Sequence, residues 1–170
     1  SQVDRLLARL CCFPRPTVGA LAGHWCAAGG MLGLALDYRV MSNDCGVFFV
    51  PGVDLGLVYS PTQIELMKAK LPTTMHRDVI IFNTRQWTAK ELMSAGVVET
   101  AVPSRHVMFK ALEVAEGLKP KGRGPARSAL GAIKRGVYRA VSAAAEAGGE
   151  MSFPGRSPGV DRPAHLSEPR

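Results

Sequence analysis

Three side chains of this sequence are the first candidates for moving a proton. His24 lies inside the Gly- and Ala-rich run 23–30, and an imidazole can act as a base near neutral pH. Asp54 and Glu65 are carboxylates farther along the chain, and general acid–base catalysis uses such groups. We expect His24 to have a packing or hydrogen-bonding role and Glu65 to lie on the surface. Asp54 therefore remains as the candidate for acid–base catalysis.

The thiols do not indicate a metal site. The cysteines are Cys11, Cys12, Cys26 and Cys45. They form no C-x-x-C pair, and no histidine lies at zinc-ligand spacing from them. We expect reduced thiols in an intracellular protein, with no bound metal.

The chain carries 21 Lys and Arg against 14 Asp and Glu, a formal net charge of +7. The excess is concentrated late in the sequence, in Lys119, Lys121, Arg123, Arg127, Lys134, Arg135 and Arg139. Such a surface is commonly a solvated helix face, and the functional alternative is attraction of a polyanion. Few aromatic residues interleave with these charges, so a platform for stacking nucleic-acid bases is poorly supported and no nucleic-acid partner is expected.

Alternating strands and helices must position these residues. Apolar and β-prone runs predict strands at 17–21, 38–41, 47–50 and 97–102, and apolar periodicity predicts helices at 3–10, 31–36, 60–71, 77–82, 88–95, 107–118 and 126–147. The strongest local signals are two capping boxes, one from Ser60 to Gln63 and one from Thr88 to Glu91. The resulting order of elements predicts an α/β chain with helical crossovers.

The length of 170 residues fits one domain, predicted over 1–147. No run is long and apolar enough to span a bilayer, and no secretory signal is visible. The chain begins at Ser1 rather than Met, so we expect that earlier residues, including any transit peptide, are missing. From Gly148 onward Gly, Pro, Ser and Arg dominate, which predicts a disordered tail over 148–170. It ends without an S-K-L-type peroxisomal signal.

Three blocks of the sequence resemble the crotonase (enoyl-CoA hydratase/isomerase) superfamily. They are PTVGALAGHWCAAGGMLGLALDYRVM at 16–41, FFVPGVDLGLVYSP at 48–61, and the segment 87–103. Within the superfamily the chain resembles plant-type peroxisomal Δ3,Δ2-enoyl-CoA isomerases in its G-H-x-x-A-A, Asp37–Tyr38 and V-D-L-G-L patterns. The resemblance implies a partial crotonase-like (ClpP/crotonase) ββα spiral with C-terminal helices.

The resemblance also implies where a substrate would lie. Family members hold the oxygen of an acyl thioester between two backbone N–H groups, an oxyanion hole that stabilises the charge left by proton removal. By position the second donor is the N–H of Ala28, and Ala27, Gly29 and Gly52 would border the substrate. The alternative is that residues 27–30 are small only to allow tight packing of a helix on a strand.

The chain departs from the family at its catalytic acids. The two positions at which hydratases carry glutamate are Met31 and Gly52 here. In an extended segment Asp54 would share a face with Gly52, so a displaced carboxylate is conceivable, although we favour a structural role for Asp54. Isomerisation, which needs one acid–base group, is therefore favoured over hydration.

The front of the family domain is also absent, because the chain begins at about the third turn of the spiral. The missing part would supply the first oxyanion donor and much of the adenine–ribose site. Its absence indicates that the sequence is a fragment. Loss of one such donor typically costs about 3 to 4 kcal/mol of transition-state stabilisation.

The resemblance therefore implies an enoyl-CoA isomerase-like protein of fatty-acid β-oxidation, without a cofactor other than the coenzyme A of its substrate. The alternative is a catalytically inactive subunit that binds acyl-CoA or assembles with related chains. RNA binding through the basic helices is known for some basic members of this superfamily, and here the net charge is its only support. The resemblance further implies a homo-trimer or hexamer, located in the peroxisome or the mitochondrion.

Overall fold

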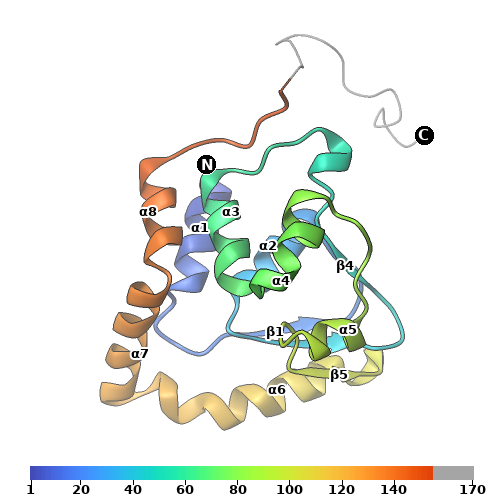
Figure 1. Ribbon diagram of the computed structural model, residues 1–170. Helices are drawn as coiled ribbons and strands as arrows, with labels where there is room; N and C mark the ends of the chain where they lie inside the picture. The colour runs from blue at the N-terminus through green and yellow to red at the C-terminus, as the bar shows by residue number, and fades with distance from the viewer. Residues whose placement is uncertain (155–170) are drawn as a thin grey trace, which may run out of the picture.

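The computed structural model describes residues 1–154 (Figure 1). Its strands are β1 Val18–Leu21, β2 Trp25–Cys26, β3 Tyr38–Ser42, β4 Phe48–Phe49 and β5 Thr100–Val102. Its α-helices are α1 Gln2–Cys11, α2 Ala27–Ala35, α3 Pro61–Lys70, α4 Thr73–Met75, α5 Ala89–Ser94, α6 Val107–Leu118, α7 Gly124–Val137 and α8 Arg139–Ala147. Short 3-10 turns lie at Val53–Leu55, Ser104–His106 and Lys119–Gly122, and a π-helix at His76–Ile81.

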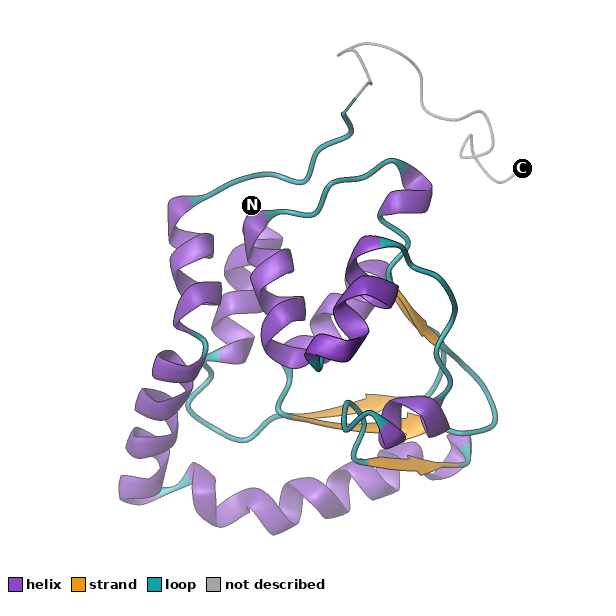
Figure 2. Ribbon diagram, viewed as in Figure 1, coloured by secondary structure: helices purple, strands orange, loops and turns teal. Residues whose placement is uncertain are grey.

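The strands form two small parallel sheets (Figure 2). In the larger one β3 lies between β1 and β5, with Val18 opposite Tyr38 and Val40 opposite Thr100. In the smaller one Trp25 of β2 lies opposite Phe48 of β4. Parallel strands require crossovers, and the helices between them supply these. The α/β class with helical crossovers is thus confirmed.

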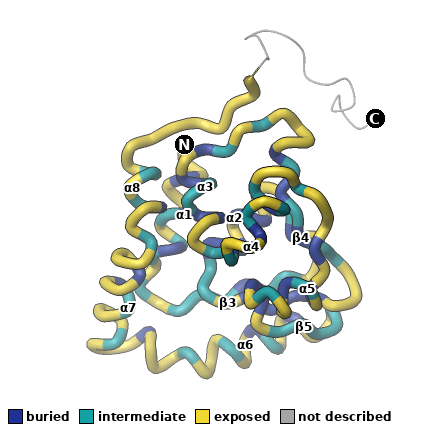
Figure 3. Tube along the Cα trace, viewed as in Figure 1, coloured by how far each residue is buried: buried dark blue, intermediate teal, exposed yellow. Residues whose placement is uncertain are grey.

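Helices cover the larger sheet on both faces. On one side α1, α2 and α3 bury the main core, which includes Leu7, Leu34 and Leu66 (Figure 3). On the other side α6 packs against β1 and β3 and buries Val107 against Val40. The last helix, α8, packs against α1 and α3 and places Val141 in the main core, so α8 completes the core rather than extending away from it.

Small residues in α2 allow it to lie close to the smaller sheet. A Cβ added at Gly33 would lie 2.1 Å from Nε1 of Trp25, and one added at Gly30 would lie 3.3 Å from the ring of Phe48. The Trp25 and Phe48 rings pack against each other in a tilted arrangement, with centroids 4.3 Å apart and an angle of 39° between the ring planes. The packing explanation of the run 27–30 therefore holds for Gly30, and Gly33, which lies beyond the run, packs in the same way.

Both predicted capping boxes are confirmed. The hydroxyl of Ser60 accepts from the N–H of Gln63, whose side chain accepts in return from the N–H of Ser60. Thr88 and Glu91 make the same reciprocal pair at the start of α5. These contacts need only four consecutive residues, so local sequence determines them.

Three predicted elements differ from the structure, and one strand was not predicted. The helix expected at 126–147 is two helices that break at Tyr138, whose hydroxyl accepts a hydrogen bond from Lys70 Nζ at 2.9 Å. The strand expected at 97–102 is only β5, because the carbonyl of Val97 accepts from the buried Arg39 side chain instead. The helix expected at 31–36 begins earlier, at Ala27, and β2 was not predicted.

An ion pair with little exposure to solvent holds α7 against the segments that precede β1 and β3. Nζ of Lys134 lies 2.5 Å from Asp37 and also donates to the carbonyls of Phe13 and Arg15. Asp37 in addition accepts from the backbone and the hydroxyl of Thr17. Every donor on this lysine has an acceptor, so the residue is structural and is not part of a free basic surface.

All four cysteines are free thiols.

The segment from Gly148, expected as a tail, is described as far as Pro154. Within it Ser152 pairs with Val58 through backbone hydrogen bonds of 2.8 and 3.1 Å. Residues 155–170 of that predicted tail lie outside the described residues. No helix within the described part of the chain has the length and apolar character to cross a membrane.

Candidate functional site

A cavity of about 490 Å³ lies between α1, the start of α2, the loop that leads to α3, and the segment after α8. It is lined by Ser1, Val3, Asp4, Ala27, Ala28, Met31, Pro51, Gly52, Leu55, Leu57, Tyr59, Gln63, Glu150 and Met151. Most of these side chains are apolar or small. Such a wall favours an apolar ligand with a few polar contacts.

The start of α2 faces this cavity with backbone rather than with long side chains. Cys26 is extended, and Ala27 has φ +47°, a left-handed conformation that is costly for a residue with a Cβ. Strained backbone of this kind clusters at ligand-binding sites. Ala28 is the second residue of the helix, so its N–H is among the four that have no partner inside the helix. The positive end of the helix dipole therefore borders the cavity at Ala28.

At Gly52 a tyrosine takes the space that a side chain would need. The Tyr59 hydroxyl accepts from the N–H of Gly52 at 2.6 Å and donates to the carbonyl of Val50 at 2.7 Å. A Cβ at Gly52 would lie 2.3 Å from the Tyr59 ring and hydroxyl. Burial raises the pKa of Tyr59, so its phenol stays neutral at physiological pH. No carboxylate fits at Gly52 while Tyr59 holds this position.

The other predicted site residues divide into two groups. Ala27, Ala28 and Gly52 border the cavity together, and the buried Met31 adds an apolar wall. Gly29 and Asp54 do not border it: a Cβ at Gly29 would meet nothing within 4 Å, and the exposed Asp54 accepts from Asn83 at 2.5 Å. The displaced carboxylate considered at Asp54 is therefore not part of the cavity wall.

The remaining acid–base candidates also lie elsewhere. His24 is exposed and is not among the residues that line the cavity. Glu65 pairs with Lys68 at 2.7 Å on α3, as expected for a surface residue.

Two carboxylates in the cavity wall were missed by sequence reasoning. Asp4 is buried and accepts from the hydroxyls of Ser60, at 2.7 Å, and Ser1, at 2.9 Å. Glu150 is exposed, and no hydrogen bond or ion pair joins it to another described residue. Asp4 carries a helix-start signal, Ser1 followed by Asp4, whereas Glu150 follows two glycines in a stretch without any pattern.

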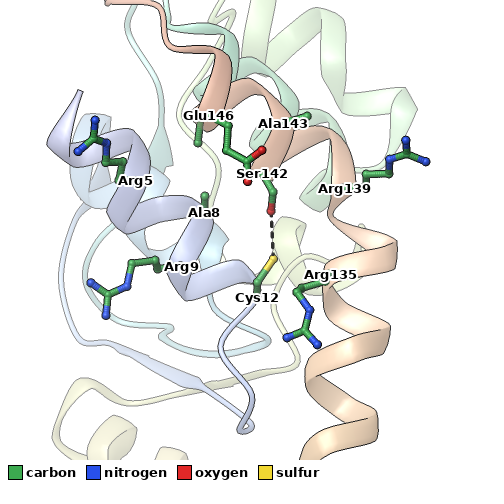
Figure 4. A pocket seen from close by; sticks show the side chains of 10 residues that line it. Arg5, Ala8, Arg9, Cys12, Arg135, Arg139, Ser142, Ala143 and Glu146 are labelled. Atoms are coloured by element: carbon green, nitrogen blue, oxygen red, sulfur yellow. Dashed lines mark hydrogen bonds between the residues drawn. The ribbon is translucent and has the colours of Figure 1, made fainter.

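A second cleft of about 860 Å³ lies between α1 and the pair α7 and α8 (Figure 4). Cys12 and Ser142 meet across it with their side chains 3.3 Å apart. Four arginines line it, Arg5, Arg9, Arg135 and Arg139, together with Glu146. In Figure 4 Arg5 and Arg9 extend to one side and Arg139 to the other, so the guanidinium groups do not converge on one point.

Comparisons with known proteins show which family this chain resembles and which fold it shares. The model of the enoyl-CoA hydratase/isomerase family matches residues 1–152. The chain is 34% identical over 96 residues to enoyl-CoA delta isomerase 2, peroxisomal, of Arabidopsis thaliana, and 33% identical over 96 residues to enoyl-CoA delta isomerase 3 of the same plant. Each match covers 56% of this chain and 40% of the relative, so the chain spans less than half the length of these relatives.

Solved structures share the fold. An enoyl-CoA hydratase/isomerase family protein from Pseudomonas syringae superimposes with a TM-score of 0.73 and 26% identity, over 86% of this chain and 63% of that one. A probable enoyl-CoA hydratase from Mycobacterium tuberculosis H37Rv has the same TM-score at 22% identity, over 85% of this chain and 60% of that one. The predicted crotonase-type architecture with C-terminal helices is confirmed.

Proposed function

The chain belongs to the enoyl-CoA hydratase/isomerase family, and we propose that its cavity binds an acyl thioester of coenzyme A and moves a double bond along the acyl chain. One observation carries the proposal. Ala28, at the positive end of α2 where the backbone N–H groups have no partner inside the helix, lines an apolar cavity together with Gly52. A thioester carbonyl beside that N–H would gain stabilisation as negative charge develops on its oxygen.

The choice of isomerisation over hydration follows from the wall of the cavity. Addition of water to a double bond in this family uses two carboxylates, and Met31 and Gly52 stand where these would lie. Moving a double bond needs only one group that accepts a proton at one carbon and returns it to another. An apolar wall also suits an acyl chain, which gains stability from leaving water.

Calorimetric titration with a 3-enoyl thioester of coenzyme A, followed by an isomerase assay on the same sample, tests the proposal. Ala28→Leu places a bulky side chain in the cavity and should abolish binding. Gly29→Leu is the matched control, because a side chain at Gly29 enters open space. Absence of binding to the wild-type chain, or equal binding by the two variants, would contradict the proposal.

A second candidate function has its own observation. The Tyr59 ring occupies the space beside Gly52, so a thioester bound in the cavity would meet no carboxylate at that position. A non-catalytic acyl-CoA-binding subunit would have this arrangement. Binding without turnover would establish it, and turnover gained in a Gly52→Glu, Tyr59→Ala double variant would show that the scaffold is otherwise intact.

A role in fatty-acid β-oxidation and a peroxisomal location belong to the same proposal. They are supported by relatives in Arabidopsis thaliana that are named as peroxisomal enoyl-CoA delta isomerases.

Assembly into a trimer or hexamer is supported by the apolar outer face of α6, where Met108 and Phe109 are 62% and 70% exposed. Light scattering of the purified chain tests the assembly, and imaging of a tagged chain tests the location.

A further inference from the structure

We infer that Glu150 is the carboxylate that moves the proton in the cavity, an inference that rests on the proposed isomerisation. Glu150 lies beyond α8, in a segment that lines the same cavity as Ala27 and Ala28 at the start of α2. It replaces neither of the two family glutamates in position. It would supply the same chemical group from another part of the chain.

The backbone around Glu150 has a defined course. Gly148 and Gly149, at φ +79° and +130°, turn the chain at the end of α8, and residues with a Cβ rarely adopt these conformations. A Cβ at Gly149 would also lie 2.9 Å from the ring of Pro61. Two residues beyond Glu150, the Val58–Ser152 bridge fastens the segment to the loop that carries Leu57 and Tyr59. Glu150 is thus held between two anchored points beside the cavity.

Glu150 is also the cavity carboxylate that is free to react. Of the two carboxylates in the wall within residues 1–154, Asp4 accepts from two hydroxyls and ties α1 to the start of α3. Glu150 has no such partner in the described part of the chain. Tyr59 also borders the cavity, but its hydroxyl is occupied by Gly52 and Val50. A base must have a lone pair to offer, and Glu150 meets that condition.

The chemistry balances with this one group. The Glu150 carboxylate takes a proton from C2 of a 3-enoyl thioester, and the electron pair of the broken C–H bond delocalises onto the thioester oxygen beside the N–H of Ala28. The carboxylic acid so formed returns its proton to C4. The double bond moves from C3–C4 to C2–C3, the carboxylate is regenerated, and no other reactant is consumed.

Glu150→Gln tests the inference in the full chain, because it keeps the shape of the side chain and removes its basicity. Loss of a positioned acid–base group typically slows a reaction by about 10² to 10⁴-fold, so turnover of a 3-enoyl thioester should fall by at least ~100-fold. Thioester affinity should change by less than about threefold, a small difference in binding free energy. Glu146→Gln is the matched control, since Glu146 lies four residues earlier, in α8, and lines the other cleft. It should keep wild-type turnover.

Mass spectrometry of the thioester after incubation in D₂O gives a second readout. The wild-type chain should place deuterium at C2 and C4, and Glu150→Gln should not. Wild-type turnover in Glu150→Gln would overturn the inference while the proposed function stands, and a parallel loss of affinity would overturn it by showing a binding role. Binding without turnover by the wild-type chain would overturn both.

Discussion

Substitution of Gly52 by alanine should destabilise the fold through Tyr59. Gly52 has φ −58° and ψ −51°, which any residue adopts, so alanine by itself would stabilise by about 0.4–1 kcal/mol through the unfolded chain. The added Cβ, however, would lie 2.3 Å from Cζ and Oη of Tyr59. Moving the ring costs roughly 1–3 kcal/mol of overpacking. It also breaks two hydrogen bonds, each of which contributes about 1 kcal/mol.

The sum predicts that Gly52→Ala lowers the free energy of unfolding by about 2–4.5 kcal/mol, mostly through the displaced ring. For a chain of this size that corresponds to a Tm roughly 5–15 °C lower. Urea and thermal unfolding, followed by circular dichroism, measure both quantities. The same substitution in a Tyr59→Ala background should cost less than about 0.5 kcal/mol, because the ring is no longer there to clash.

Two results would refute this reasoning. One is a Gly52→Ala chain as stable as wild type, and the other is an equal cost with and without the Tyr59 ring. Gly29→Ala is the matched control, since its added Cβ meets nothing within 4 Å. It should be neutral or should stabilise α2 by up to about 1 kcal/mol, because alanine is the better helix former.

Three further predictions follow from contacts elsewhere in the fold. Gly33→Ala would bring a Cβ 2.1 Å from Nε1 of Trp25, so it should destabilise by about 2–3 kcal/mol and shift tryptophan fluorescence; an unchanged Tm and spectrum would contradict the packing. Lys134→Met leaves the largely buried Asp37 without its cation and should cost about 3 kcal/mol in urea unfolding, part of which Asp37→Asn should restore. Burial raises the pKa of Cys11 to about 11, so this thiol should resist iodoacetamide at pH 8 until the chain unfolds. Between pH 9 and 11 the thiol ionises in the unfolded chain before it does in the folded one, so the free energy of unfolding should fall as the pH rises through this range.

The sequence predicted the features that depend on neighbouring residues. The capping boxes at Ser60 and Thr88, and the bounds of α6, are present as expected. The family resemblance predicted that Ala27, Ala28, Gly29 and Gly52 would border one site, and all of these except Gly29 line one cavity. These features are carried either by local hydrogen bonds or by a motif long enough to be recognised.

Features that depend on distant contacts were not predictable in the same way. The break at Tyr138 involves Lys70, 68 residues away, and no local residue marks it. The contact between Gly52 and Tyr59 arises only when the 3-10 turn folds the loop back on itself. Glu150 follows a glycine pair in a segment whose composition indicated disorder, and its place beside the cavity comes from the pairing of Ser152 with Val58.

The carbonyl of a bound thioester gives the most direct test of the site. A 3-enoyl thioester of coenzyme A, labelled with ¹³C at the carbonyl, is titrated with the chain and followed by ¹³C NMR. If the Ala28 N–H donates to the carbonyl oxygen, the resonance should move downfield on binding, and Ala28→Leu should abolish the shift while Gly29→Leu retains it. A bound thioester whose carbonyl resonance is unmoved, or moves equally in Ala28→Leu, would contradict the assignment of this cavity as the thioester site.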